Sequence, residues 1–146
     1  DSAVIEAGEW VSDLPEMGDL KLKVRGEDNE AFKKYMNKRL RSVPKGARNR
    51  DGTLPPAVLE ALTGEAYLET VLIDWDNLRD GDTPITYDKE LARTFLTDKD
   101  YRDFFGAVRW AAQNVARAKS EVDEGILGNS APPSNGSKAG AATPKP

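Results

Sequence analysis

The segment from Thr70 to Val108 restricts the possible folds most, since helical spacing of apolar residues stops there at a polar turn and then resumes. Before the turn, the apolar positions predict one long core helix that begins at Pro55 and continues to Trp75. The turn itself, from Arg79 to Pro84, is rich in Asp and Gly, which favour chain reversal. The segment therefore predicts a mainly helical domain.

Three further helices follow from apolar residues at every third or fourth position. Each begins where a side chain can cap a helix N-terminus. The predicted helices run from Asp28 or Asn29 to Arg41, from Asp88 to Leu96, and from Thr97 or Asp98 to Gly125. Gly64 lies inside the core helix and indicates close packing or a kink, since glycine costs a helix about 1 kcal/mol relative to alanine. The residues predicted to form the core are Leu59, Leu62, Val71, Leu72 and Phe104.

Residues 20–25 alternate apolar and basic side chains, which is the pattern of a half-buried strand. We predict that this strand pairs with Trp10-Val11 as a short hairpin, with its lysines on the exposed side. Trp10, Trp75 and Trp110 all fit apolar faces, so burial or partial burial is predicted for each. An exposed tryptophan would instead indicate a partner-binding surface, because tryptophan anchors tend to dominate interfaces.

The fold predicted from these elements is mainly α, a small single domain of about four helices with a short N-terminal β-hairpin or strand pair. The 146 residues divide into a flexible lead-in (1–8), the domain (9–127) and a flexible, low-complexity C-terminal tail (128–146). Residues 42–53 carry Pro, Gly and Asp-Gly turn signals, so a mobile loop is predicted there.

Missing residue types exclude several kinds of chemistry. The chain has no Cys and no His, so it lacks disulfides, thiolates and the commonest metal ligand and general base. The acidic run from Asp74 to Asp82 resembles a calcium loop, but Leu78 and Arg79 stand where a ligand and a glycine are required. No glycine-rich phosphate loop is present. We therefore predict no catalytic, cofactor-binding or metal-binding residues and no enzyme activity.

The composition favours a cytoplasmic protein. Mean hydropathy is -0.62, and no apolar run is longer than that at residues 71–73, whereas a membrane span needs roughly 18 apolar residues. The first ten residues lack the basic and apolar regions of a signal peptide. No association with a membrane is expected.

The net charge of -4 conceals a strong segregation along the chain. Residues 21–50 carry eleven basic and three acidic side chains, whereas residues 51–100 carry twelve acidic and four basic ones. The two segments could pair within one molecule or simply be solvated faces, since exposed ion pairs are common and contribute only about 0–1 kcal/mol each. They could instead join copies head to tail as a homo-oligomer. Binding of nucleic acid by residues 21–50 is a third possibility, which the overall acidity disfavours.

Several blocks of sequence resemble a known family in their order and spacing. These blocks are the strand-to-helix opening at residues 22–35, Val71-Leu72-Ile73-Asp74-Trp75-Asp76-Asn77-Leu78, the turn before Pro84-Ile85-Thr86-Tyr87-Asp88-Lys89-Glu90-Leu91-Ala92, and Phe104-Phe105. Across residues 9–120 the chain resembles the tail assembly chaperones of long-tailed bacteriophages and related prophage elements. The long Pro- and Ala-rich end departs from that pattern.

The resemblance implies a protein of the host bacterial cytoplasm that is not an enzyme and is absent from the mature virion. Members of that family coat the tape measure protein before the tail tube polymerises around it. A longer product made by ribosomal frameshifting recruits tail tube subunits, and the slip is predicted near Lys138 or Lys145 of this chain.

Partner binding is assigned to two sets of residues, and no binding of nucleic acid is expected under this hypothesis. The candidate residues are Trp75, Leu78, Tyr87, Phe104, Phe105 and Trp110, together with Arg39, Arg41, Lys45, Arg48 and Arg50. Two alternatives remain open. One is a minor structural or connector protein of the phage tail, and the other is a nucleic-acid-binding regulator that uses residues 21–50.

Overall fold

The computed structural model describes residues 2–130, with side chains described for residues 5–123. The α-helices in this range are α1 (Ser2–Ala7), α2 (Glu30–Ser42), α3 (Pro56–Thr70), α4 (Lys89–Thr97) and α5 (Arg102–Ser130). The strands are β1 (Glu9–Val11), β2 (Lys21–Val24), β3 (Leu72–Asp76), β4 (Arg79–Asp80) and β5 (Thr83–Pro84), and the 3-10 helices are η1 (Lys45–Ala47) and η2 (Lys99–Tyr101). The chain divides into two compact units, residues 1–116 and 117–146, and the packing below is that within the first.

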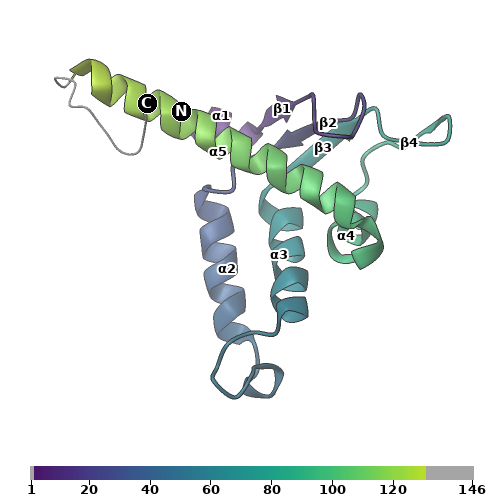
Figure 1. Cartoon of the computed structure of the whole chain (residues 1–146), viewed down its shortest axis with the longest axis vertical. Coiled ribbons are helices and arrows are strands. Elements are labelled where there is room, and N and C mark those ends of the chain that lie inside the picture. The colour runs from purple at the N-terminus through teal and green to yellow at the C-terminus, as the bar shows by residue number, and fades with distance from the viewer. Residues whose placement is uncertain (1, 131–146) are drawn as a thin grey trace. The chain divides into compact units, whose positions relative to one another are not determined.

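Strands β1, β2 and β3 form a three-stranded antiparallel sheet in that order (Figure 1). The alternation predicted for residues 20–25 is confirmed, because Leu22 and Val24 are fully buried while Lys21 is exposed. Pairing of β2 with β1 confirms the predicted N-terminal hairpin. The mainly helical prediction is thus supported, although the sheet is larger than a strand pair.

The predicted core helix is wrong at its C-terminal end. Helix α3 stops at Thr70, Val71 leaves helical geometry with φ -120 and ψ -60, and residues 72–76 form strand β3. Trp75 pairs across the ladder with Leu22, and both side chains are buried. The apolar run at 71–73 suits either a helix end or a buried strand, and pairing with β2 decides between them.

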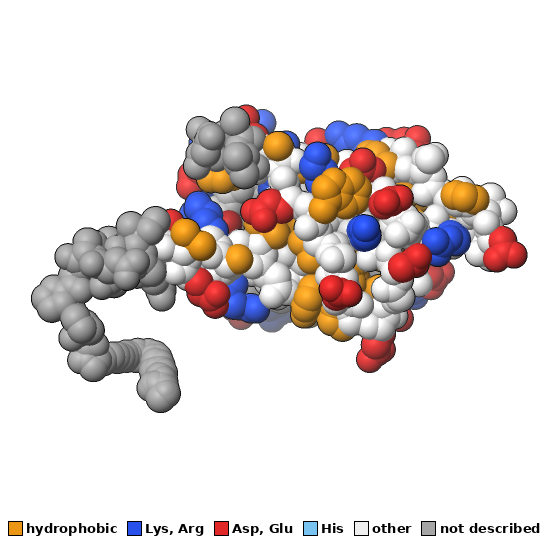
Figure 2. Space-filling model, turned by 90° about the horizontal axis from the view of Figure 1, so that it is seen from above, with side chains coloured by type: hydrophobic (Ala, Val, Ile, Leu, Met, Phe, Trp, Pro, Cys, Tyr) orange, Lys and Arg blue, Asp and Glu red, His pale blue; other side chains and the backbone are white. Residues whose placement is uncertain are grey.

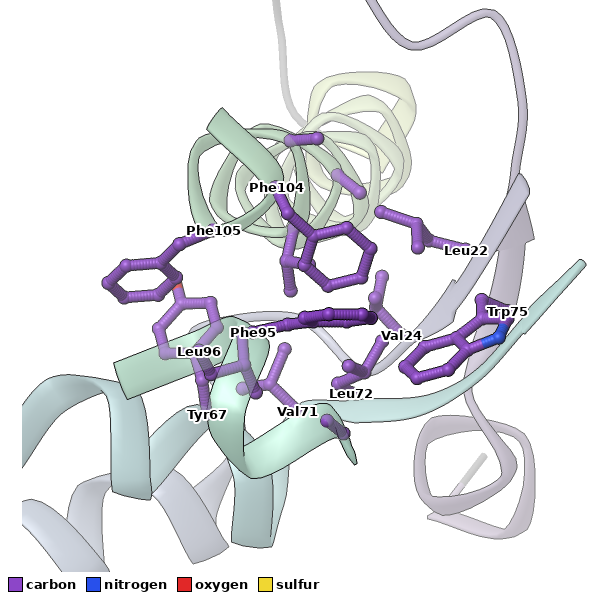
Figure 3. Packing of buried hydrophobic residues seen from close by; sticks show 14 of the residues in the cluster. Leu22, Val24, Tyr67, Val71, Leu72, Trp75, Phe95, Leu96, Phe104 and Phe105 are labelled. Carbon is purple, nitrogen blue, oxygen red and sulfur yellow. The ribbon is translucent and has the colours of Figure 1, made fainter. Parts of the chain in front are cut away.

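The core lies between the sheet, α3, α4 and the first half of α5 (Figure 3). Tyr67 is fully buried between Phe32 and Phe105, whose ring centroids lie 5.6 Å and 5.3 Å from its own in edge-to-face contacts. Four of the five residues predicted to be core are buried, namely Leu62, Val71, Leu72 and Phe104. The prediction for Leu59 is wrong, since this side chain is 41% exposed.

Helix starts were predicted better than helix ends. The Asn29 side chain caps α2 by accepting a hydrogen bond from the backbone N–H of Phe32 at 2.8 Å, and Asp88 caps α4 in the same way. Helix α5 continues to Ser130, beyond the predicted end at Gly125. Part of the predicted lead-in forms α1, and residues 131–146 of the predicted tail lie outside the described residues.

Tyr67 makes the stability of this core sensitive to alkaline pH. Burial raises the pKa of its phenol, and the hydrogen bond that it donates to Glu27 raises that pKa further. The unfolded chain ionises a tyrosine near pH 10, about where this stabilisation begins to be lost as pH rises. We expect Tyr67→Phe to cost about 1 kcal/mol near pH 7, because Glu27 loses its donor.

The measurement is urea denaturation of both proteins at several pH values from 7 to about 11.5. The wild type should lose stability more steeply than Tyr67→Phe above about pH 10. Equal slopes for the two proteins would contradict the assignment. Some slope should remain in the variant, because burial also raises the pKa of Tyr87.

Candidate partner-binding surface

The aromatic residues assigned to partner binding mostly face the protein's own core. Trp75 is 4% exposed, and Phe104 and Phe105 are each 8% exposed. Leu78 and Tyr87 are half-buried and pack against that core. The structure therefore brings these side chains together around the centre of the fold, and Trp75, Leu78 and Tyr87 also line a pocket of about 590 Å³.

Two of the three tryptophans lie at the surface. Trp75 is buried as predicted, whereas Trp10 on β1 is 48% exposed and Trp110 on α5 is 38% exposed. Seen from above, the face over α5 and the sheet carries acidic and basic side chains interspersed with hydrophobic ones (Figure 2). Charge is therefore mixed on this face.

The five basic residues assigned to partner binding gather at one place. Arg39 and Arg41 belong to the last turns of α2, Lys45 belongs to η1, and Arg48 and Arg50 follow in the connecting loop. Helices α2 and α3 lie side by side, and this loop joins them at the end away from the sheet (Figure 1). We call this end of the helix pair the basic tip, defined by the five residues named here.

Arg48 holds the loop of the basic tip in place. Its guanidinium donates to the carbonyl of Leu40 at 2.5 Å and to that of Gly52 at 2.9 Å. A cation at the last carbonyls of α2 also complements the helix dipole. Asp51 accepts from the hydroxyl and the N–H of Thr53, and these bonds lower the pKa of its carboxyl. The loop predicted to be mobile is therefore closed by hydrogen bonds.

The other cations of the basic tip differ in their surroundings. Arg39 donates to the hydroxyl of Tyr35 at 2.5 Å and lies over the tyrosine ring. Arg41, Lys45 and Arg50 are exposed, and none of them makes an ion pair within residues 2–130. These three charges are consequently held at the surface without a counterion from the described part of the chain.

Among the described residues, no ion pair joins the two oppositely charged segments to each other. Ion pairs within the described residues join Lys33 to Glu30, Arg79 to Asp19, Lys89 to Glu69, and Arg93 to Glu65 and Glu90. None of these pairs links a basic side chain of residues 21–50 to an acidic one of residues 51–100. Among the described residues, the charge segregation is therefore not a matter of ion pairing between the two segments, and solvated faces and contacts with another molecule remain as explanations.

An apolar groove runs beside the basic tip, between the end of α2, η1 and the first half of α3. Its volume is about 520 Å³, and its lining is mostly apolar. The lining residues are Arg39, Ser42, Val43, Pro44, Ala47, Ala57, Val58, Ala61, Leu62, Glu65 and Thr97. No residue of α2 is buried, so the apolar side of this helix also remains within reach of solvent.

The groove was not predicted, although the sequence contains signals for the helix pair that forms it. Pro44 and Gly46 end α2, and Pro55-Pro56 begins α3, so the chain must return within about a dozen residues. Helices joined this way pack side by side. Exposed Ala57 and Ala61 then leave a hollow on α3 that a count of large apolar residues cannot reveal.

Two further features are absent from residues 2–130. Over that range, no three His, Cys, Asp or Glu side chains come together as a group that could hold a metal ion. The described helices likewise include none with the length and apolar character required to span a bilayer.

The described chain thus holds an α-rich domain with a groove between two helices, and beside the groove lies the basic tip, whose Arg41, Lys45 and Arg50 make no ion pair within residues 2–130. Residues 27–129 match the family model described as YdaY prophage protein, and the chain belongs to this family. It is therefore a prophage protein. No curated protein and no solved structure matches the chain. The matched range includes the groove and the basic tip, whereas β1 and β2 precede it.

Proposed function

We propose that this prophage protein is a tail assembly chaperone. In this role it binds the tape measure protein in the host cytoplasm, has no catalytic activity and is absent from the finished particle. Three observations support the proposal. The chain belongs to a family of prophage proteins, its sequence resembles the tail assembly chaperones, and it presents a groove suited to a helix.

The observation that carries the proposal is the groove between α2 and α3. Helix α2 spans 13 residues without a buried side chain, and α3 keeps Val58 half-buried and Ala61 exposed beside it. Amphipathic helices of partner proteins commonly bind in such grooves through apolar residues at every third or fourth position. A chaperone of a long helical protein needs a surface of this kind, whereas an enzyme needs convergent reactive groups.

The proposal is tested by co-expressing the chain with the tape measure protein of its own prophage. We expect the two proteins to copurify, and the tape measure protein to become soluble only when the chain is present. A tape measure protein that stays soluble alone and never copurifies would overturn the proposal. The tail tube protein alone should not be retained, because its recruitment is assigned to a longer, frameshifted product.

A connector protein of the tail is the alternative that the same groove would suit. Mass spectrometry of purified particles separates the two functions, since a chaperone should be absent and a connector present in fixed copy number. The frameshifted product is tested at the level of the gene. A coding sequence without a slippery heptamer near the codons for Lys138 or Lys145 would count against it.

A further inference from the structure

We propose that the groove beside the basic tip binds an acidic amphipathic helix of the partner protein. The helix would lay its apolar side between α2 and α3 and place its acidic flank against Arg41, Lys45 and Arg50. This inference rests on the proposed function and deepens it, because it assigns the contact to one place and specifies the chemistry of the partner.

The apolar part of the contact is already formed in the groove. Leu62 is only 5% exposed and forms part of the lining, while Val43 and Val58 are half-buried along it. Ala57 and Ala61 lie one turn apart on α3 and are exposed. Small side chains at a helix contact let a second helix approach more closely, since the distance between helix axes depends on the residues between them.

The charge of the basic tip determines which kind of partner helix would bind in the groove. Arg41, Lys45 and Arg50 are exposed without ion pairs among the described residues, and the carboxylate of Asp51 is engaged by Thr53. A carboxylate-bearing flank would therefore meet cations there that have no competing counterion. Complementary charge of this kind raises association rates and fixes orientation.

The acidic charge of the rest of the chain favours binding of an acidic helix at the basic tip over binding elsewhere. The net charge is -4, although residues 21–50 carry a net charge of +8. An acidic helix is thus repelled by most of the molecule and attracted at its basic segment. Like-charge repulsion elsewhere excludes wrong binding positions, which is how specificity is commonly obtained.

The same observations disfavour nucleic acid at this site. The residues that line the groove include no aromatic side chain, so it offers no platform on which bases could stack. Phosphates would use the rim cations but gain nothing from Val43, Val58 and Leu62. A protein helix uses both parts of the surface.

The test measures binding of the purified tape measure protein to the full chain and to matched variants. Lys45→Glu/Arg50→Glu reverses two charges of the basic tip outside α2, and Arg79→Glu/Lys89→Glu makes the same change in charge at exposed positions outside residues 21–50. Ala61→Glu fills the groove with a bulky acidic side chain at an exposed helical position, and Ala31→Glu is its control on the first turns of α2.

We expect both groove variants to weaken binding at least about tenfold, with the rim variant acting mainly through slower association and a weaker salt dependence. Both controls should bind within about twofold of wild type, and all four should keep the circular dichroism spectrum of the wild type. Undiminished binding by the groove variants would overturn the site while leaving the proposed function intact.

Synthetic peptides test the site even if the tape measure protein does not bind, which would itself overturn the proposed function. One amphipathic helical peptide carries a glutamate flank, and a matched peptide carries lysine. Binding of the glutamate peptide by wild type, and its loss in Ala61→Glu, supports the site. Preference for the lysine peptide or for single-stranded RNA overturns it. Self-association abolished by Lys45→Glu/Arg50→Glu, without peptide binding, also overturns it in favour of a second copy of the chain.

Discussion

Replacing Gly64 with alanine is expected to lower the free energy of unfolding by about 2–3 kcal/mol, although alanine is the better helix former. A Cβ atom at this position would lie 2.2 Å from the carbonyl oxygen of Leu96 and 3.3 Å from the Cγ2 atom of Thr97. The oxygen belongs to the backbone of α4 and cannot rotate away, so α3 and α4 would have to separate. This contact confirms the close packing that the glycine indicated in the sequence.

Gly106→Ala provides a matched control within a second helix. Nothing lies within 4 Å of a Cβ atom built at Gly106 in α5, so only the gain in helix propensity applies. We expect this variant to be more stable than wild type by up to about 1 kcal/mol. Urea denaturation measures both effects, provided that the dependence of the free energy of unfolding on urea concentration is the same as in the wild type. Stabilisation by both substitutions would show that α3 and α4 do not touch at Gly64.

The sequence predicted those elements whose signals are local. The caps at Asn29 and Asp88 and the alternation in β2 each depend on residues within one turn or one strand, and the structure confirms all three. Strand β3 was missed because its residues suit a helix equally well. Its pairing with β2 is set by residues about 50 positions away, which no local window contains.

The residues assigned to partner binding also differ in how well the sequence predicted their positions. Charged side chains are expensive to bury, so the basic residues 39–50 were placed correctly at the surface by sequence alone. The presence of an apolar aromatic residue does not indicate whether its side chain is buried or exposed, because such residues occur both in cores and at interfaces. Phe104 and Phe105 were assigned to a partner but pack in the core, whereas the exposed Trp10 was expected to be buried or partly buried.

Trp75→Ala is expected to have the largest effect of any substitution considered, lowering the free energy of unfolding by about 3–5 kcal/mol. The indole is 4% exposed, and its ring centroid lies 4.9 Å from that of Tyr87 and 5.8 Å from that of Phe104. Its Nε1–H donates to the carbonyl of Ile85 at 2.7 Å. Truncation would therefore open a cavity and release the segment between β5 and α4 from the sheet.

Trp75→Phe separates packing from hydrogen bonding, since it retains a ring but leaves the Ile85 carbonyl without its donor. We expect an intermediate loss, whereas Trp110→Ala on the surface should change stability by no more than about 0.5 kcal/mol. Urea denaturation followed by circular dichroism measures all three without relying on tryptophan fluorescence. If Trp75→Ala were as stable as Trp110→Ala, strand β3 would not pack as described, and the predicted helix through residue 75 would have to be reconsidered.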